Sequence, residues 1–292
     1  MSKTKIISVS SGKGGVGKTT VTANLGSALA FKGKKTLVID FDIGQRNLDL
    51  LLGLENRIVY TIADVLDKKA SFKKAMIFSK YDKKLSFIAA SQNETAEVLN
   101  FEKVKDFLEE IVNSKESEQF DYIIIDSPAG VEHGFQAAIS RADFNIVVVN
   151  PEISSLRDSD KAIGLIDAST KAEELGGQAR KGLVVNRIDK KMVKEEQQLN
   201  LLDIKDVTEV DILGVVPMEP SLIESSNIGK PVFYDDSKAV AASFNDLADS
   251  VIEDFRIYNE EELINFFDSK FLNWNVFKWI GNIASSGKKI RN

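Results

Sequence analysis

The stretch from Ser11 to Thr20, SGKGGVGKTT, decides the fold class. It contains the pattern G-x-x-x-x-G-K-T and lies between an apolar run at residues 6–9 and a segment with helical spacing at residues 19–31. A glycine-rich loop that joins a strand to a helix with this spacing is typical of sites that bind nucleoside triphosphates. An ordinary glycine turn before a helix is the alternative, and the full spacing in its context disfavours it.

The same stretch predicts how phosphate is bound. Its glycines let backbone N–H groups converge on phosphate oxygens, and the positive end of the following helix strengthens that field. The pattern places Lys18 to reach the β- and γ-phosphates and Thr19 to bind Mg²⁺ through its hydroxyl. A second lysine, Lys13, comes five residues before Lys18, and one loop around one triphosphate gives it no task.

Apolar runs suited to buried parallel strands recur along the chain and alternate with longer stretches of helical spacing. They lie at residues 6–9, 36–39, 85–89, 122–125, 145–149, 182–185 and 212–216. Because the connections are long enough for right-handed crossovers, this alternation predicts an α/β fold with a doubly wound, mostly parallel sheet. We expect one domain over residues 1–258, followed by a linker and a helix over residues 259–292.

Acidic side chains follow two of these runs, at the point where each predicted strand ends. Asp40 and Asp42 come after one run and Asp126 after another. Ligands of open α/β sheets bind at the carboxyl ends of the strands, so the three carboxylates should share one rim. Asp126 suits a direct or indirect contact with Mg²⁺, and Asp40 or Asp42 could orient an attacking water. Each acid could instead cap a turn, but three on one rim favour a metal–nucleotide site.

The composition excludes several other classes. The 292 residues include no cysteine, which excludes disulfides, iron–sulfur ligation and thiol catalysis. No apolar run reaches about 18 residues and no basic segment leads into an apolar block, so we expect neither a spanning helix nor a signal peptide. The net charge is −6, and the +4 on residues 271–292 leaves −10 on residues 1–270. The acidic body disfavours nucleic acid, and the basic end suggests an interaction tail.

With its extra lysine, the motif KGGVGKTT resembles the deviant Walker A group of P-loop NTPases, of the SIMIBI type. The segments DFDIGQRNLDLLLGLENRIVY, DSPAGVEHG and NPEISSLRDSDKAIGLID resemble the MinD family, the bacterial division-site ATPases. The similarity covers almost all of residues 4–255, and Gln45 stands where leucine is more usual. The resemblance implies an ATPase whose cofactors are ATP and Mg²⁺.

The resemblance also implies a task for Lys13. In these ATPases two subunits close face to face over two ATP molecules, and the signature lysine crosses to the partner's phosphates. A lysine on each chain then neutralises charge only when two ATP-loaded faces meet. ATP holds such a homodimer together, and hydrolysis weakens it because ADP lacks the γ-phosphate.

The matching positions imply a complete set of site residues. Catalytic roles fall to Lys13, Lys18 and Asp42, where Asp42 positions water, and the metal region is made by Thr19, Asp40 and Asp126. ATP is bound by Gly12, Lys13, Gly14, Gly15, Val16, Gly17, Lys18, Thr19, Thr20, Asn186 and Pro217. The last two border the adenine in this reading, although Asn186 could equally close a turn after its strand.

The stretch PEISSLRDSD carries a helix start, because Ser155 and Asp158 fit the pattern [ST]-x-x-[DE]. The resemblance adds that this helix lies at the dimer edge, where a MinE-like activator and a MinC-like inhibitor compete. The implied partner contacts are Ser154, Asp158 and Asp160. His133, the only histidine, should have no catalytic task, because this kind of phosphoryl transfer depends on positioning and charge.

The end of the chain, FLNWNVFKWIGNIASSGKKIRN, is unusually aromatic and is followed by basic residues. Placed on a helix, its apolar side chains form a broad stripe, which favours an amphipathic helix on an anionic membrane surface over a last helix docked on the core. The expected membrane contacts are Phe271, Trp274, Phe277, Trp279, Ile280 and Ile283. One such helix should bind marginally, whereas two on a dimer gain roughly 10²-fold in avidity.

Together with these observations, the resemblance implies a cytoplasmic ATPase that lies on the inner face of the cell membrane in its ATP state, positions the division septum and recruits a division inhibitor. Partner-stimulated ATP hydrolysis is then expected to release it. A regulator of flagellar number similar to FlhG is one alternative. A DNA-partitioning or cargo-positioning ATPase similar to ParA is another, against which the acidic body argues. A scaffold that binds ATP without turnover is the third.

Overall fold

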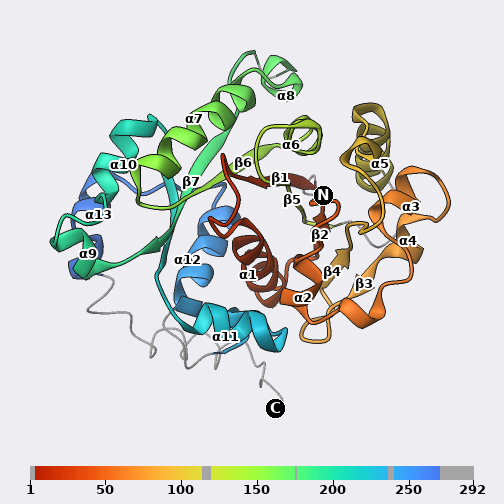
Figure 1. Ribbon diagram of the computed structural model, residues 1–292, viewed down its shortest axis with the longest axis horizontal. Helices are drawn as coiled ribbons and strands as arrows, with labels where there is room; N and C mark the ends of the chain where they lie inside the picture. The colour runs from red at the N-terminus through yellow and green to blue at the C-terminus, as the bar shows by residue number, and fades with distance from the viewer. Residues whose placement is uncertain (1–3, 114–119, 175, 236–239, 270–292) are drawn as a thin grey trace.

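The apolar runs of the sequence form the strands of one central sheet. The computed structural model describes residues 4–113, 120–174, 176–235 and 240–269, and among these residues eight strands are hydrogen-bonded in the order β3-β4-β2-β5-β1-β6-β7-β8 (Figure 1). Their bounds are β1 Lys5–Ser10, β2 Thr36–Asp40, β3 Ile77–Phe78, β4 Leu85–Ile88, β5 Tyr122–Asp126, β6 Phe144–Val149, β7 Lys181–Ile188 and β8 Ile212–Pro217. All neighbours pair in parallel except β3 with β4. The predicted fold class is therefore confirmed.

Helices cover both faces of the sheet (Figure 1). The α-helices of the described residues are α1 Lys18–Phe31, α2 Leu48–Leu52, α3 Ile62–Leu66, α4 Phe72–Ala75, α5 Phe101–Asn113, α6 His133–Ile139, α7 Ile153–Asp167, α8 Thr170–Glu174, α9 Lys190–Lys194, α10 Leu201–Thr208, α11 Ser221–Ile228, α12 Val240–Ile252, α13 Glu260–Ile264 and α14 Phe266–Ser269. Short 3₁₀ turns lie at Glu55–Arg57, Ala96–Val98 and Val232–Tyr234. In this part of the chain no helix is both long enough and apolar enough to cross a membrane.

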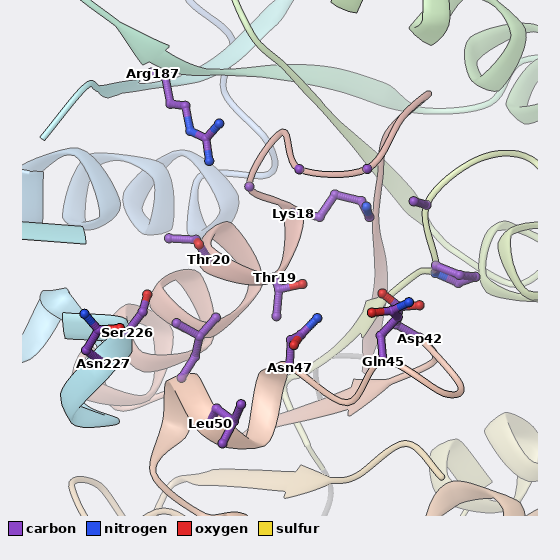
Figure 2. Close-up of a pocket in the computed structure, with 16 residues that line it drawn as sticks. Lys18, Thr19, Thr20, Asp42, Gln45, Asn47, Leu50, Arg187, Ser226 and Asn227 are labelled. Carbon is purple, nitrogen blue, oxygen red and sulfur yellow. The ribbon is translucent and has the colours of Figure 1, made fainter. Parts of the chain in front are cut away.

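The register of the central strands brings acidic side chains to one edge. β5 reads YIIID and is buried along its whole length, as expected of a strand covered on both faces. Asp126 at its end is paired with Val9 of β1 and with Asp40 of β2. Lys18 and Asp42 lie at the same edge (Figure 2). The strand pairing therefore places Asp40 and Asp126 side by side at the carboxyl ends of the parallel strands.

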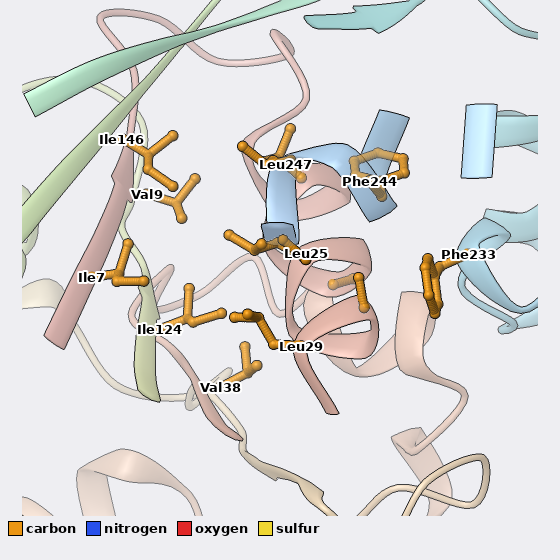
Figure 3. Close-up of a cluster of buried hydrophobic side chains, with 14 of the residues drawn as sticks. Ile7, Val9, Leu25, Leu29, Val38, Ile124, Ile146, Phe233, Phe244 and Leu247 are labelled. Atoms are coloured by element: carbon orange, nitrogen blue, oxygen red, sulfur yellow. The ribbon is translucent and has the colours of Figure 1, made fainter. Parts of the chain in front are cut away.

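Helix α1, which carries the glycine-rich loop at its start, is fixed deep in the core. Leu25 and Leu29 belong to the core cluster, where Leu29 lies near Val38 and Ile124 of the sheet and Leu25 lies near Leu247 of α12 (Figure 3). A Cβ on Gly26 would lie 2.7 Å from Val38, so glycine allows the helix to approach the sheet this closely. Asn24 accepts a hydrogen bond from the backbone N–H of Phe233 at 3.0 Å. The loop is therefore attached to a helix that is buried in the core.

Packing continues past Tyr258, which was the predicted end of the domain. Leu263 of α13 and Phe266 of α14 are buried in the cluster that also contains Tyr258. The rings of Tyr258 and Phe266 meet edge to face at 5.9 Å. The division into a domain and a C-terminal segment stays a prediction, but residues 259–266 include core positions. The predicted membrane contacts at residues 271–283 lie outside the described residues.

Candidate nucleotide-binding site

Two glycines of the loop between β1 and α1 have a positive φ, a backbone conformation that favours glycine over other residues. Gly15 has φ +79° and Gly17, which caps the start of α1, has φ +100°. A Cβ on Gly17 would also lie 2.2 Å from the side-chain amide nitrogen of Asn186. That nitrogen donates to the carbonyl of Val16 at 2.7 Å. Asn186 of β7 therefore lies beneath the loop and fixes its backbone.

The start of the loop lies directly against α7. A Cβ on Gly12 would be 1.9 Å from the carbonyl oxygen of Asp158, so only glycine fits here. The Nζ of Lys13 donates to the hydroxyl of Ser154 at 3.3 Å. Two of the three predicted partner contacts thus touch the loop, and the third, Asp160, is exposed on the same helix.

The charges of Asp126 and Asp42 act on the amine of Lys18, and Asp40 is paired with Asp126 across the neighbouring strands. Asp40 and Asp126 are each 1% exposed, and Asp42 is half-buried. Asp40 accepts from the backbone N–H of Asp42 at 2.9 Å, and Asp126 accepts from the hydroxyl of Thr22 at 3.0 Å. The Oδ2 atoms of both Asp40 and Asp126 are buried without a hydrogen-bond partner. Such atoms are costly unless a ligand or ion satisfies them.

Burial controls how these groups titrate. It raises the pKa of Asp126 to about 6, although the charge of Lys18 acts in the opposite direction. Burial, together with the charge of Asp126, raises the pKa of Asp40 well above its ordinary value. Burial also raises the pKa of Asp42 and lowers the pKa of Lys18, while the attraction between these opposite charges opposes both shifts. The positive charge of Lys18 is thus too small to offset the cost of burying the carboxylates of Asp40, Asp42 and Asp126 in their ionised form.

These residues fit Mg²⁺ and a nucleotide. Mg²⁺ prefers oxygen ligands and is usually held by one or two protein groups together with phosphates and waters. The unpartnered oxygens of Asp40 and Asp126 and the hydroxyl of Thr19 provide such groups. No set of three or more His, Cys, Asp or Glu side chains able to hold a metal alone is found among the described residues. These oxygen ligands therefore suit a metal ion that is bound jointly by the protein and by the phosphates of a nucleotide.

The loop opens into a pocket of about 740 Å³ (Figure 2). Its lining includes Gly14, Gly15, Gly17, Lys18, Thr19, Thr20 and Asp42, which were all predicted site residues. The other predicted residues do not line it: Gly12, Lys13, Val16, Asp40, Asp126, Asn186 and Pro217. Pro217 is the buried last residue of β8, so a contact of Asn186 or Pro217 with adenine stays a prediction.

Sequence reasoning missed several lining residues. They are Gln45, Asn47, Leu50, Leu51, Pro128, Ala129, Arg187, Ser226 and Asn227. Gln45, Asn47, Pro128 and Ala129 follow β2 or β5 closely, and Arg187 lies near the end of β7, so the rule that ligands bind at the carboxyl ends of strands could have found these five. Ser226 and Asn227 lie in α11, and the sequence carries no signal for their position. His133 lies away from this pocket, at the start of α6.

A glycine-rich loop that starts a buried helix, facing strand-end carboxylates across a parallel sheet, defines a P-loop nucleotide-binding protein. A profile of the AAA domain family matches residues 4–174. The septum site-determining protein MinD of Helicobacter pylori is 44% identical over 237 residues, which are 81% of this chain and 87% of that protein. The chain belongs to the MinD family of septum site-determining proteins, which confirms the resemblance of the sequence motifs.

Solved structures agree with this assignment. The MinC:MinD cell division protein complex of Aquifex aeolicus contains a chain that is 43% identical, with a TM-score of 0.76 over 85% of this chain and 96% of that chain. The septum site-determining protein MinD of Pyrococcus horikoshii complexed with Mg-ADP is 32% identical, with a TM-score of 0.72 over 85% of this chain and 96% of that chain. The chain is thus an ATPase by family.

Proposed function

We propose that this protein is a Mg²⁺-dependent ATPase that dimerises on ATP at the inner face of the cell membrane and positions the division septum. The observation that carries the proposal is the convergence of the loop, Lys18 and three strand-end carboxylates at one edge of the sheet. The Mg-ADP in the Pyrococcus horikoshii relative supports ATP and Mg²⁺ as its cofactors.

Within one subunit the residues divide the work of hydrolysis. Backbone N–H groups of residues 12–19 bind and orient the phosphates, and Lys18 neutralises charge that builds up on the β- and γ-phosphates. Asp42 orients the water that attacks the γ-phosphorus as the bond to the β-phosphate oxygen breaks. Mg²⁺ supplies further neutralisation of the phosphate charge when bound. Asp40, Asp126 and Thr19 hold the metal region.

A second subunit completes the site. Lys13 does not line its own pocket and instead donates to Ser154 on α7. When two ATP-loaded faces meet, this lysine crosses to the partner's phosphates, and release of phosphate removes the reason for the contact. ATP-dependent dimerisation follows from that charge balance.

The membrane and the protein partners act outside the pocket. Residues 270–292 bind the anionic membrane surface as an amphipathic helix, and two copies on a dimer bind firmly where one binds weakly. The exposed side chains at Ser154, Asp158 and Asp160 of α7 contact a MinC-like inhibitor or a MinE-like activator of hydrolysis. The MinC:MinD complex of Aquifex aeolicus supports the inhibitor.

The test is turnover and co-sedimentation of the full chain with anionic vesicles in the presence of Mg²⁺. We expect phosphate release, and pelleting with ATP but not with ADP. A truncation after Ser269 should abolish pelleting and leave nucleotide binding unchanged, because it spares the buried Leu263 and Phe266. Equal pelleting with both nucleotides would refute the dimer switch, and pelleting of the truncated chain would refute the tail as anchor.

The FlhG-like and ParA-like alternatives are less well supported, because the relatives reported above are septum site-determining proteins. Salt-sensitive retention on DNA would favour the ParA-like reading. A scaffold without turnover would release no phosphate in a single-turnover assay.

A further inference from the structure

Gln45 lines the nucleotide pocket, and the turn between β2 and α2 that carries it is held on both sides. On one side, the backbone N–H of Gly44 donates to the carbonyl of Ser91 at 2.8 Å. On the other side, Arg46 has φ +45°, in the left-handed region, and its Nε donates to the Oδ2 of the buried Asp49 at 2.6 Å. Backbone strain of this kind persists only where the surroundings enforce it. These contacts therefore fix the backbone of Gln45.

The same turn places Gln45 beside Asp42. The backbone N–H of Gln45 donates to the carbonyl of Asp42 at 3.1 Å, and both residues line the pocket. Figure 2 shows the two residues at the same end of the pocket, on the side of Lys18 and away from Arg187. Because Lys18 reaches the γ-phosphate in the proposed site, Gln45 lies at the end where the phosphate bond breaks.

The side-chain amide of Gln45 is available to a ligand. It is exposed, and none of its atoms takes part in a hydrogen bond with the residues that the structure describes. An amide oxygen accepts hydrogen bonds without adding a charge. That property suits this end of the pocket, because burial already raises the pKa of Asp42 and of Asp126 despite the charge of Lys18. A further carboxylate at this position would also repel the γ-phosphate.

We infer that Gln45 is a further catalytic residue, whose amide oxygen accepts one O–H of the attacking water while Asp42 accepts the other. The inference rests on the proposed function and deepens it. A water molecule has two O–H groups, so a single acceptor leaves it free to rotate and a second acceptor fixes its orientation toward the γ-phosphorus. Leucine at this position would have no atom able to accept.

The reaction that this water enters is a phosphoryl transfer. The oxygen of the water bonds to the γ-phosphorus, and one proton of the water passes to a γ-phosphate oxygen. The bond from the γ-phosphorus to the bridging oxygen breaks, and its electron pair stays on the β-phosphate. The products are ADP and dihydrogen phosphate, and Gln45 is unchanged.

The experiment measures single-turnover phosphate release by the full chain, held in excess over Mg-ATP, together with calorimetric affinities for ADP and for a non-hydrolysable ATP analogue. Gln45→Leu keeps the approximate size of the side chain and removes the acceptor. It should slow phosphate release about tenfold, the rate equivalent of one hydrogen bond made only in the transition state, and change neither affinity. Gln178→Leu, at an exposed position before the amino end of β7, is the matched control and should change neither rate nor affinity.

The outcomes separate the inference from the proposed function. Phosphate release at the wild-type rate in Gln45→Leu, or a loss of affinity as large as the loss of rate, would overturn the inference and leave the proposed function intact. A wild-type chain that binds no ATP, or binds it and releases no phosphate, would overturn both.

A double-variant cycle tests whether Gln45 and Asp42 orient the same water. In Asp42→Ala the water has already lost one acceptor and its fixed orientation, so adding Gln45→Leu should slow release further by about threefold or less. Losses that multiply in the double variant would show that the two residues act on different groups, and would refute the shared water.

Discussion

Replacing Asp126 by asparagine should stabilise the nucleotide-free protein and abolish its turnover. The carboxyl group has a pKa of about 6 in the folded chain against an ordinary value of 3.8, a difference that already includes the attraction of Lys18. A shift of about two units corresponds to roughly 3 kcal/mol of unfolding free energy. Because the folded pKa is raised, the folded state binds the proton more tightly. Stability is therefore lost as the pH rises from about 3.8 through 6, and the full penalty applies above that window.

The amide of Asp126→Asn removes the charge but leaves an unpartnered NH₂ where Oδ2 is now buried, at a cost of about 1–2 kcal/mol. The net gain at pH 8 is then about 1–2 kcal/mol. Between pH 5.5 and 8 the wild type should lose about 1 kcal/mol through this carboxyl, and the variant should not. Asp160→Asn, at an exposed position of α7, is the control for a change in net charge alone.

The assay is urea unfolding without nucleotide or Mg²⁺ at pH 5.5 and pH 8, together with phosphate release at saturating ATP. A variant that is less stable than the wild type at pH 8, or that keeps the same pH dependence, would refute the reasoning. Full turnover in the variant would refute a role for Asp126 in the metal region.

Three further predictions concern the loop. Gly17→Ala should lower the free energy of unfolding by about 2–4 kcal/mol and abolish ATP binding, because the added Cβ brings both backbone strain and a clash. Gly15→Ala brings backbone strain alone and should lower the free energy of unfolding, measured in urea, by about 1 kcal/mol. Gly12→Ala should speed amide hydrogen exchange in α7, and Gly14→Ala, whose Cβ would meet its nearest neighbour at 3.7 Å, should leave that exchange unchanged. Lys13→Ala should lose partner-stimulated phosphate release while nucleotide affinity changes less than threefold; full stimulated release would refute its action across the dimer.

The sequence predicted the parts of the site that follow from local pattern. The spacing of the loop and the position of acids at strand ends suffice to place Lys18, Asp42 and Asp126 at one edge, because parallel strands share that edge. β3 was not predicted, since two residues in an antiparallel edge strand give no periodic signal.

The features of the site that could not be predicted from the sequence depend on contacts between segments that are distant along the chain. The bulge at Arg187 in β7 is held by Gln198, which is eleven residues away. Asn186 is held beneath the loop by its hydrogen bond to the carbonyl of Val16, which lies 170 residues earlier in the sequence. No local propensity encodes either contact.

The fit of Gly12 against α7 has a mechanical consequence. The loop and the helix meet backbone to backbone at Asp158, since even a Cβ would overlap there. Side chains can absorb a displacement by changing rotamer, but two main chains in contact have no such slack. A protein that displaces α7 by binding its outer surface would therefore also displace the backbone of the phosphate-binding loop.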